Sequence, residues 1–207
     1  MITAYISILR PSQWLKNLML FFPSFLGGHL LEPGMPSAGI LPFAAFCLVS
    51  SAGYLFNDIM DRERDLCHPG KRMRPIPSGK VSPFIAAVLS GALLCCGIVL
   101  AIPVSGPFLL LLLLYAAVSI GYSLWMKNIP VVDLFCVSAG FLLRMQAGGE
   151  AFHVVVSPWL FMCVLLLSVF LCAGKRLGEF RALGGSASSH RGVLALYPQV
   201  FWTGLCT

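Results

Sequence analysis

The stretch LPFAAFCLVSSAGYLF, residues 41–56, runs directly into NDIMDRERD, residues 57–65. The first part belongs to an apolar segment near residues 37–57, close to the roughly 20 residues that a helix needs to cross a bilayer. The second part places six ionisable side chains within nine residues. The sequence therefore predicts a membrane helix with a dense group of charges at one end.

The composition places the whole chain among integral membrane proteins. Apolar residues make up 58% of the 207 residues and charged residues only 11%, whereas about a quarter of a soluble domain is charged. The eight cysteines form no CxxC pair, and neither they nor the four histidines have the spacing of a zinc site. We interpret the cysteines as small packing residues.

Six complete membrane spans and the start of a seventh are expected. The seventh begins near residue 193, and the complete spans lie near residues 14–31, 37–57, 82–104, 107–126, 131–149 and 157–174. The predicted fold class is an all-α polytopic membrane bundle, built as one domain over residues 1–207. The ending FWTGLCT, residues 201–207, looks like the middle of a helix, so we expect a bundle that is truncated at its C-terminus.

The positive charges predict the orientation of the bundle. Thirteen of the fourteen lysines and arginines lie before or in the first span, or in the loops after the second, fourth and sixth spans. The three opposite loops contain none, which by the positive-inside rule puts the N-terminus and the Asp-rich segment in the cytoplasm of an inner-membrane protein. The net charge of +6 is therefore a property of one membrane face, which suits anionic lipid heads or a phosphorylated substrate. We assign no nucleic-acid partner, and a homo-oligomer stays open.

Three aspartates in the charged segment have the spacing of one helical face. Asp58, Asp61 and Asp65 stand at i, i+3 and i+7, so on a continuing helix they fall within about 60° of one another. Carboxylates so close repel each other unless a cation lies between them, and Mg²⁺ prefers such oxygen ligands. Asn57 could add a neutral carbonyl or donate to a phosphate. The alternative is a solvated segment whose acids balance the interleaved arginines.

A basic segment follows the aspartates within ten residues. HPGKRMRPIPSGK, residues 68–80, supplies Lys71, Arg72 and Arg74. Together, residues 58–80 combine carboxylates for a metal with guanidinium groups that fork onto phosphates, which suits a magnesium–diphosphate. The alternative, a topology signal alone, leaves the adjacent acids unexplained.

These residues resemble the UbiA-type prenyltransferase superfamily. Its pattern N-D-x-x-D-x-x-x-D is met at residues 57–65, and R-P-x-x-S-G follows at residues 74–79. The resemblance extends to YSLWMKNIPVVDLF at 122–135 and FLLRMQAGG at 141–149. It implies a helical bundle of about nine spans around a cavity whose active site opens at the cytoplasmic end.

Within that superfamily the chain most resembles the decaprenyl-phosphate phosphoribosyltransferases. RPSQWLKN at 10–17, HPGKRMRPIPSG at 68–79 and AGKRLGEF at 173–180 carry this closer likeness. Aromatic prenyltransferases of the superfamily have a second D-x-x-x-D after the sixth span, where this chain has Lys175, Arg176 and Glu179. The resemblance implies Mg²⁺-dependent transfer of 5-phosphoribose from phosphoribosyl diphosphate to a polyprenyl phosphate.

The resemblance also implies roles for individual residues. The expected metal ligands and catalytic residues are Asp58, Asp61 and Asp65. The expected substrate-binding residues are Lys16, Asn17, Asn57, Lys71, Arg72, Arg74, Tyr122, Lys127, Asp133, Lys175, Arg176 and Glu179. Two of these have open alternatives: Asn17 as an interfacial residue without a role, and Asp133 as a simple partner of Lys127. For Arg144, inside the fifth span, we favour a structural role, because an intramembrane arginine must be paired or in water.

Two other functions are compatible with the sequence besides phosphoribosyl transfer. One is a UbiA-type enzyme that moves a prenyl group from a prenyl diphosphate to an aromatic or other acceptor, against which the missing second D-x-x-x-D argues. The other is a non-catalytic membrane fragment, scaffold or transporter. Transporters usually place their polar site near the bilayer midplane, whereas these polar residues gather at one face.

Overall fold

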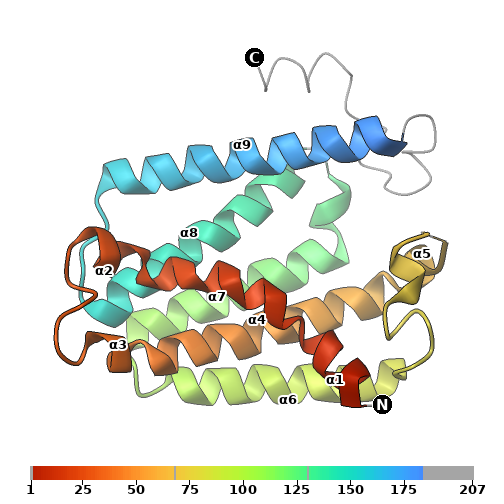
Figure 1. Cartoon of the computed structure of the whole chain (residues 1–207), viewed down its shortest axis with the longest axis horizontal. Coiled ribbons are helices and arrows are strands. Elements are labelled where there is room, and N and C mark those ends of the chain that lie inside the picture. The colour runs from red at the N-terminus through yellow and green to blue at the C-terminus, as the bar shows by residue number, and fades with distance from the viewer. Residues whose placement is uncertain (1, 68, 130, 184–207) are drawn as a thin grey trace.

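The computed structural model describes residues 2–67, 69–129 and 131–183 (Figure 1). Within these ranges every regular element is a helix, which confirms the all-α prediction. The predicted start of a seventh span near residue 193 lies outside the described residues.

Five long helices form the body of the bundle and lie side by side in Figure 1. They are α4 (Ile40–Met60), α6 (Pro83–Ala101), α7 (Gly106–Leu124), α8 (Val132–Phe152) and α9 (Pro158–Leu183). Two of them begin as the sequence suggests: Ser82 and Ser105 cap α6 and α7 by accepting a backbone N–H, and a proline occupies the first turn. α4 packs against α6 and α7, while α8 packs against α7 and α9.

The predicted first span has a different local structure from the others. α1 (Ile2–Leu9) is followed by η1 (Pro11–Phe21), a long 3₁₀ helix, and by the short α2 (Phe22–Leu26). Arg10, between α1 and η1, has a left-handed backbone with φ of 52°. The α3 helix (Met35–Ala38) then leads into α4. A 3₁₀ helix rises about 2.0 Å per residue, so η1 covers more depth than an α-helix of the same length would.

Within the part of the chain that the structure describes, four helices are long and apolar enough to cross a membrane: α4, α6, α7 and the Pro158–Gly178 part of α9. Two of the six predicted spans, η1–α2 and α8, are not among them. α8 fails on polarity, since it carries Asp133, Arg144 and Glu150. Its polar side chains are largely turned inward, because Asp133 and Arg144 are only 0% and 4% exposed.

The largest apolar core lies where η1, α4, α7 and α8 meet. Phe46 is fully buried there and packs its ring against Phe108 and Tyr115, at centroid distances of 5.7 and 5.4 Å. Leu20 of η1 belongs to the same cluster. The core therefore holds the irregular first segment firmly against the long helices.

The chain connections at one end of the bundle carry most of the predicted site. α5 (Arg62–Cys67) and η2 (Lys71–Met73) follow α4, and η3 (Met126–Asn128) joins α7 to α8. The predicted Asp-rich and basic loop, residues 58–80, is therefore partly helical, since α4 runs on to Met60. The loop expected after residue 174 is also wrong, because α9 continues to Leu183.

Candidate active site

The three aspartates lie where α4 gives way to α5, and they do not form one continuous stripe. α4 ends at Met60, and Asp61 has φ of −92° and ψ of 4°, outside the helical range. Asp65 still donates its backbone N–H to the carbonyl of Asp61 at 2.8 Å. Because the helix breaks at Asp61, Asp58 and Asp65 both face Arg74, whereas the Asp61 carboxylate points toward Lys127.

Arg74 binds two of the predicted carboxylates with a single nitrogen. Its Nη1 donates to Oδ2 of Asp65 at 2.6 Å and to Oδ1 of Asp58 at 3.2 Å. Asp58 and Asp65 are only 5% and 4% exposed. Two buried carboxylates this close would repel each other without a positive charge between them. A basic residue of 68–80 therefore contacts two of the aspartates directly, whereas we expected Arg74 to bind substrate phosphates.

Arg10 is a site residue that the sequence reasoning missed. Its Nη2 donates to Oδ1 and Oδ2 of Asp58 at 2.5 and 2.7 Å, and its guanidinium carbon lies 5.3 Å from the centre of the Tyr54 ring. The motif RPSQWLKN, which begins at Arg10, was a signal that could have pointed to it. The left-handed backbone at Arg10 directs the chain from α1 into η1 at this point.

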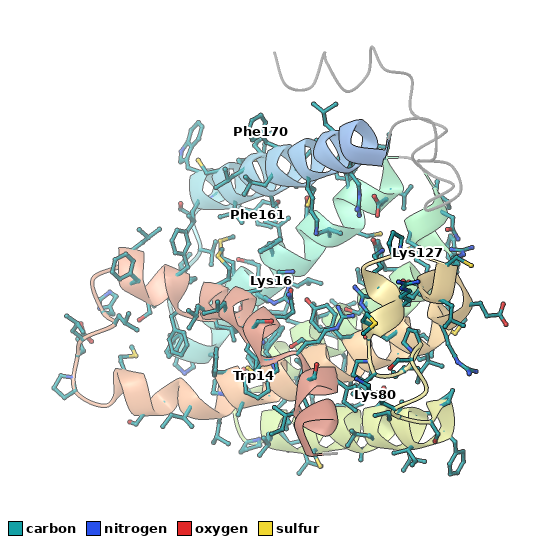
Figure 2. All side chains as sticks on the ribbon, turned by 45° about the vertical axis from the view of Figure 1, so that its right-hand side comes forward. Trp14, Lys16, Lys80, Lys127, Phe161 and Phe170 are labelled. Carbon is teal, nitrogen blue, oxygen red and sulfur yellow. The ribbon has the colours of Figure 1, made fainter. Side chains whose placement is uncertain are left out.

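Asp61 has its own cation on a different element. Lys127 of η3 donates from Nζ to Oδ1 of Asp61 at 2.6 Å, and Lys127 is only 6% exposed. Asn57 donates its amide N–H to Oδ2 of Asp61 at 3.1 Å. Figure 2 shows Lys127 on this side of the bundle, near α5, and Lys16 farther inward, on η1. The pair ties η3 to the Asp-rich segment.

The arrangement fits a magnesium ion, although the described residues contain no group of three acidic, histidine or cysteine side chains around one point. Mg²⁺ in proteins is usually held by one or two carboxylates together with substrate phosphates. Arg74 Nη1 marks a point where Asp58 and Asp65 already bind one cation jointly. Asn57 Oδ1 is buried without a partner among the described residues, next to Asp61. Carboxylate and amide oxygens are the type of ligand that Mg²⁺ prefers.

A second charged cluster joins α7, α8 and α9. Arg176 donates from Nε and Nη2 to the two carboxylate oxygens of Asp133 at 2.7 and 3.0 Å. Tyr122 donates its hydroxyl to the same carboxylate at 2.8 Å. Asp133 is therefore the partner of Arg176, and the alternative pairing with Lys127 is not what the structure shows.

We expect Asp133→Asn to lower the free energy of unfolding by about 3 kcal/mol, because it leaves the buried Arg176 guanidinium without a carboxylate. Thermal unfolding in detergent would measure the loss. Lys175→Gln, at the exposed neighbouring position, is the matched control and should leave the unfolding temperature unchanged. An Asp133→Asn protein that unfolds at the wild-type temperature would show that the pair adds no stability.

The remaining predicted cations lie nearer the surface. Lys16, Arg72 and Lys175 are exposed, and Lys71 is half-buried. Glu179 belongs to α9, but its side chain lies outside the described residues.

Asn17 belongs to a buried network instead of the group around Asp58. Its Oδ1 accepts Nε of Arg144 at 2.7 Å, and its amide donates to Ser50 at 3.1 Å. Arg144 also donates to the hydroxyl of Tyr115 at 2.6 Å and to the carbonyl of Gly140 at 2.7 Å. This network links η1, α4, α7 and α8, in line with the structural role favoured for Arg144.

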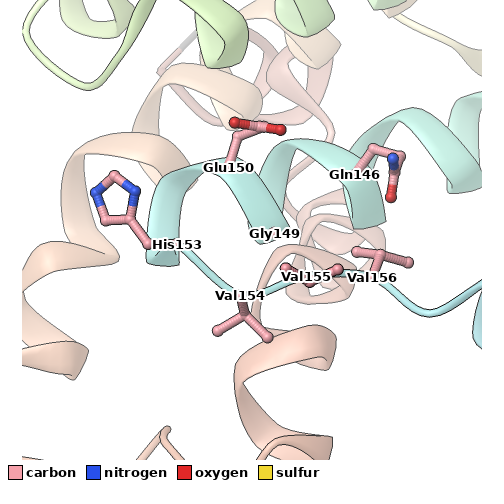
Figure 3. A pocket seen from close by; sticks show the side chains of 7 residues that line it. All are labelled: Gln146, Gly149, Glu150, His153, Val154, Val155 and Val156. Atoms are coloured by element: carbon pink, nitrogen blue, oxygen red, sulfur yellow. The ribbon is translucent and has the colours of Figure 1, made fainter.

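Neither of the two cavities described for this chain is lined by the predicted site residues. One, of about 380 Å³, lies at the far end of α8, lined by Gln146, Gly149, Glu150, His153 and residues 154–156 (Figure 3). The other, of about 330 Å³, is an apolar hollow between α4, α6 and α7. The charged clusters therefore mark the candidate site better than cavity shape does.

Known proteins match the chain in both sequence and structure. Decaprenyl-phosphate phosphoribosyltransferase from Mycolicibacterium smegmatis is 33% identical over 98% of this chain, and the enzyme of that name from Corynebacterium glutamicum is 36% identical over 84%. The chain spans 66% and 54% of the length of these relatives. A UbiA homologue from Archaeoglobus fulgidus, solved with GPP and Mg²⁺, superposes with a TM-score of 0.83 at 20% identity, over 98% of this chain and 72% of that one.

The family model extends these matches to a classification. The model of the UbiA prenyltransferase family matches residues 20–175. This range contains all three aspartates, the basic segment 68–80, Lys127 and Asp133, while Arg10 and Arg176 lie just outside it. The helical architecture of the archaeal homologue agrees with it at the level of the fold. The chain therefore belongs to the UbiA prenyltransferase family.

Proposed function

We propose that the protein is a Mg²⁺-dependent membrane transferase that moves 5-phosphoribose from phosphoribosyl diphosphate to a polyprenyl phosphate such as decaprenyl phosphate. Its active site is the cluster around Asp58, Asp61 and Asp65, which faces the cytoplasm. The relatives with the printed name decaprenyl-phosphate phosphoribosyltransferase support this proposal.

The observation that carries it is the surplus of cations at the site. Every carboxylate of the two clusters already has a cation of the chain: Arg10 and Arg74 on Asp58, Arg74 on Asp65, Lys127 on Asp61 and Arg176 on Asp133. Lys16, Arg72 and Lys175 are exposed cations that do not belong to the described ion pairs of those carboxylates. Such a surplus suits two phosphorylated substrates, a sugar with a diphosphate and a 5-phosphate, and a lipid phosphate acceptor.

The acidic residues would bind the metal and the basic residues would bind the substrate phosphates. Asp58, Asp61 and Asp65 would hold the Mg²⁺, which would supply charge neutralisation for the leaving diphosphate. Arg74 and the neighbouring Lys71 and Arg72 bind the donor phosphates, Arg74 being held in place by the carboxylates that it contacts. The acceptor phosphate is already an anion, so no strong general base is needed, and the main task is to hold two polyanions together.

The transfer assay tests the substrates. Membranes with the chain, alone and with any sequence encoded downstream of it, would receive labelled phosphoribosyl diphosphate, decaprenyl phosphate and Mg²⁺. We expect label to enter the lipid phase and EDTA to abolish the transfer, because the leaving diphosphate then has no metal.

The rival function gives a different outcome. The archaeal homologue was solved with GPP and Mg²⁺, so a prenyl diphosphate is the alternative donor. The phosphoribosyl proposal would be contradicted if neither form of the chain transfers ribose label and a prenyl group is transferred to an aromatic acid instead. Membranes without the chain provide the background.

A further inference from the structure

Two cations of the first segment share one aromatic ring next to the aspartates. The Arg10 guanidinium carbon lies 5.3 Å from the centre of the Tyr54 ring, and Lys16 Nζ lies 6.0 Å from the same centre. Both distances are within the range in which a ring face attracts a cation. Tyr54 stands one helical turn before Asp58 on α4. The ring therefore brings Arg10 and Lys16 together at the mouth of the bundle.

Arg10 keeps most of its donors available. Nη2 donates to both oxygens of Asp58, which leaves three of its five N–H groups, on Nε and Nη1, without an acceptor among the described residues. Its side chain is 22% exposed. Asp58 and Tyr54 thus fix the guanidinium while its other edge stays open. A planar pair of N–H groups of this kind matches two oxygens of a phosphate.

Lys16 has a positive charge that no acid of the described residues balances. No carboxylate lies within ion-pair distance of it among the described ion pairs. The next buried cation inward, Arg144, donates its described hydrogen bonds to neutral acceptors, so among the described residues it has no acid that Lys16 could share. Leu15 and Leu18 on either side of Lys16 are 69% and 50% exposed. A lysine between apolar side chains, without a carboxylate partner among the described residues, favours an anion with a hydrocarbon tail.

We infer that Arg10 and Lys16 form a binding subsite for a phosphate monoester over the Tyr54 ring, next to the Asp58 carboxylate that Arg10 contacts. The inference rests on the proposed function, which needs a place for a second phosphate besides the diphosphate. Two substrates could supply it, the lipid phosphate or the 5-phosphate of the sugar. The exposed Leu15 and Leu18 favour the lipid phosphate, because a polyprenyl chain packs against apolar side chains.

Binding without turnover tests the subsite. Calorimetric titration of the purified chain in detergent would use farnesyl phosphate, ribose 5-phosphate and magnesium diphosphate as separate probes. We expect Lys16→Gln to weaken farnesyl phosphate binding by about tenfold, the size of one charge-assisted hydrogen bond, and to leave magnesium diphosphate binding unchanged. Arg10→Gln should weaken the same probe, and Arg10→Lys should recover part of the loss.

Controls separate the subsite from general effects. Arg64→Gln removes one positive charge from an exposed position whose side chain donates to Asn128, and it should leave farnesyl phosphate binding unchanged. Farnesol, which lacks the phosphate, should bind wild type and Lys16→Gln equally. Because Arg10→Gln also removes a counter-ion from the buried Asp58, the exposed Lys16 provides the decisive comparison.

The outcomes are distinct from those of the transfer assay. A loss confined to farnesyl phosphate supports the subsite and assigns it to the lipid, whereas a loss confined to ribose 5-phosphate supports the subsite and assigns it to the donor. Unchanged binding of both in Lys16→Gln, no binding of either probe to wild type, or an equal loss with farnesol overturns the inference. If no ribose label is transferred but farnesyl phosphate binding still depends on Lys16, the proposed reaction is contradicted and the subsite is supported.

Discussion

Asp58→Asn should reduce label transfer by about a hundredfold or more, the scale on which loss of one charge-stabilising group lowers an enzymatic rate. Asparagine has nearly the same shape but no charge. The variant would therefore keep the packing around a residue that is only 5% exposed while removing an expected metal ligand. It would also leave Arg10 and Arg74 close together without the carboxylate that separates them. Steady-state transfer at saturating Mg²⁺ is the measurement.

A second acid of the same segment provides the control for Asp58→Asn. Glu63 of α5 is exposed, so Glu63→Gln removes the same charge from the same face without touching the cluster. Its transfer rate should stay within about twofold of wild type, since exposed charges interact weakly. The thermal unfolding of both variants would be recorded beside their activity. A folded Asp58→Asn protein with wild-type transfer would rule out the metal-ligand role.

The large features of the fold could be predicted from sequence because they depend on length and polarity. Apolar segments of the right length predicted the α4, α6 and α7 helices to within a few residues, and the start of α9. α8 could also be predicted despite its polar residues, because its apolar residues are spaced so that Asp133 and Arg144 can turn inward. Family membership also followed from local sequence, because the Asp motif and the basic segment are contiguous stretches.

The pairing of charges could not be predicted in the same way. Arg10 and Asp58 are 48 residues apart, and Asp61 and Lys127 are 66 apart; no local pattern says which cation meets which acid. The break at Asp61 was missed because the i, i+3, i+7 spacing is compatible with an unbroken helix. Asn17 was placed near the substrates from its position at the mouth of the first span, whereas its amide is used by Arg144 and Ser50. Such contacts depend on how η1 crosses α8.

That crossing depends on one glycine of α8. Gly148 packs against the backbone of η1 so closely that a methyl group at its Cβ position would lie 1.9 Å from the carbonyl oxygen of Leu20 and 2.6 Å from its carbonyl carbon. Both atoms belong to the main chain, which has no rotamer to move away. Leu20 is itself fully buried in the main core. The two segments can approach this closely only if residue 148 has no side chain.

Gly148→Ala should therefore prevent the chain from reaching its folded state. Separating η1 from α8 far enough to admit the methyl group would also pull Asn17 away from Arg144, whose hydrogen bond spans the same interface. We expect a loss above about 4 kcal/mol, in the range that marks severe core disruption, seen as aggregated protein in size-exclusion chromatography. Gly174→Ala on α9, where a methyl group meets no atom within 4 Å among the described residues, should elute and unfold like wild type. A monodisperse Gly148→Ala protein with wild-type thermal stability would mean that η1 does not contact α8 at Gly148, and the buried link between Asn17 and Arg144 would lose its support.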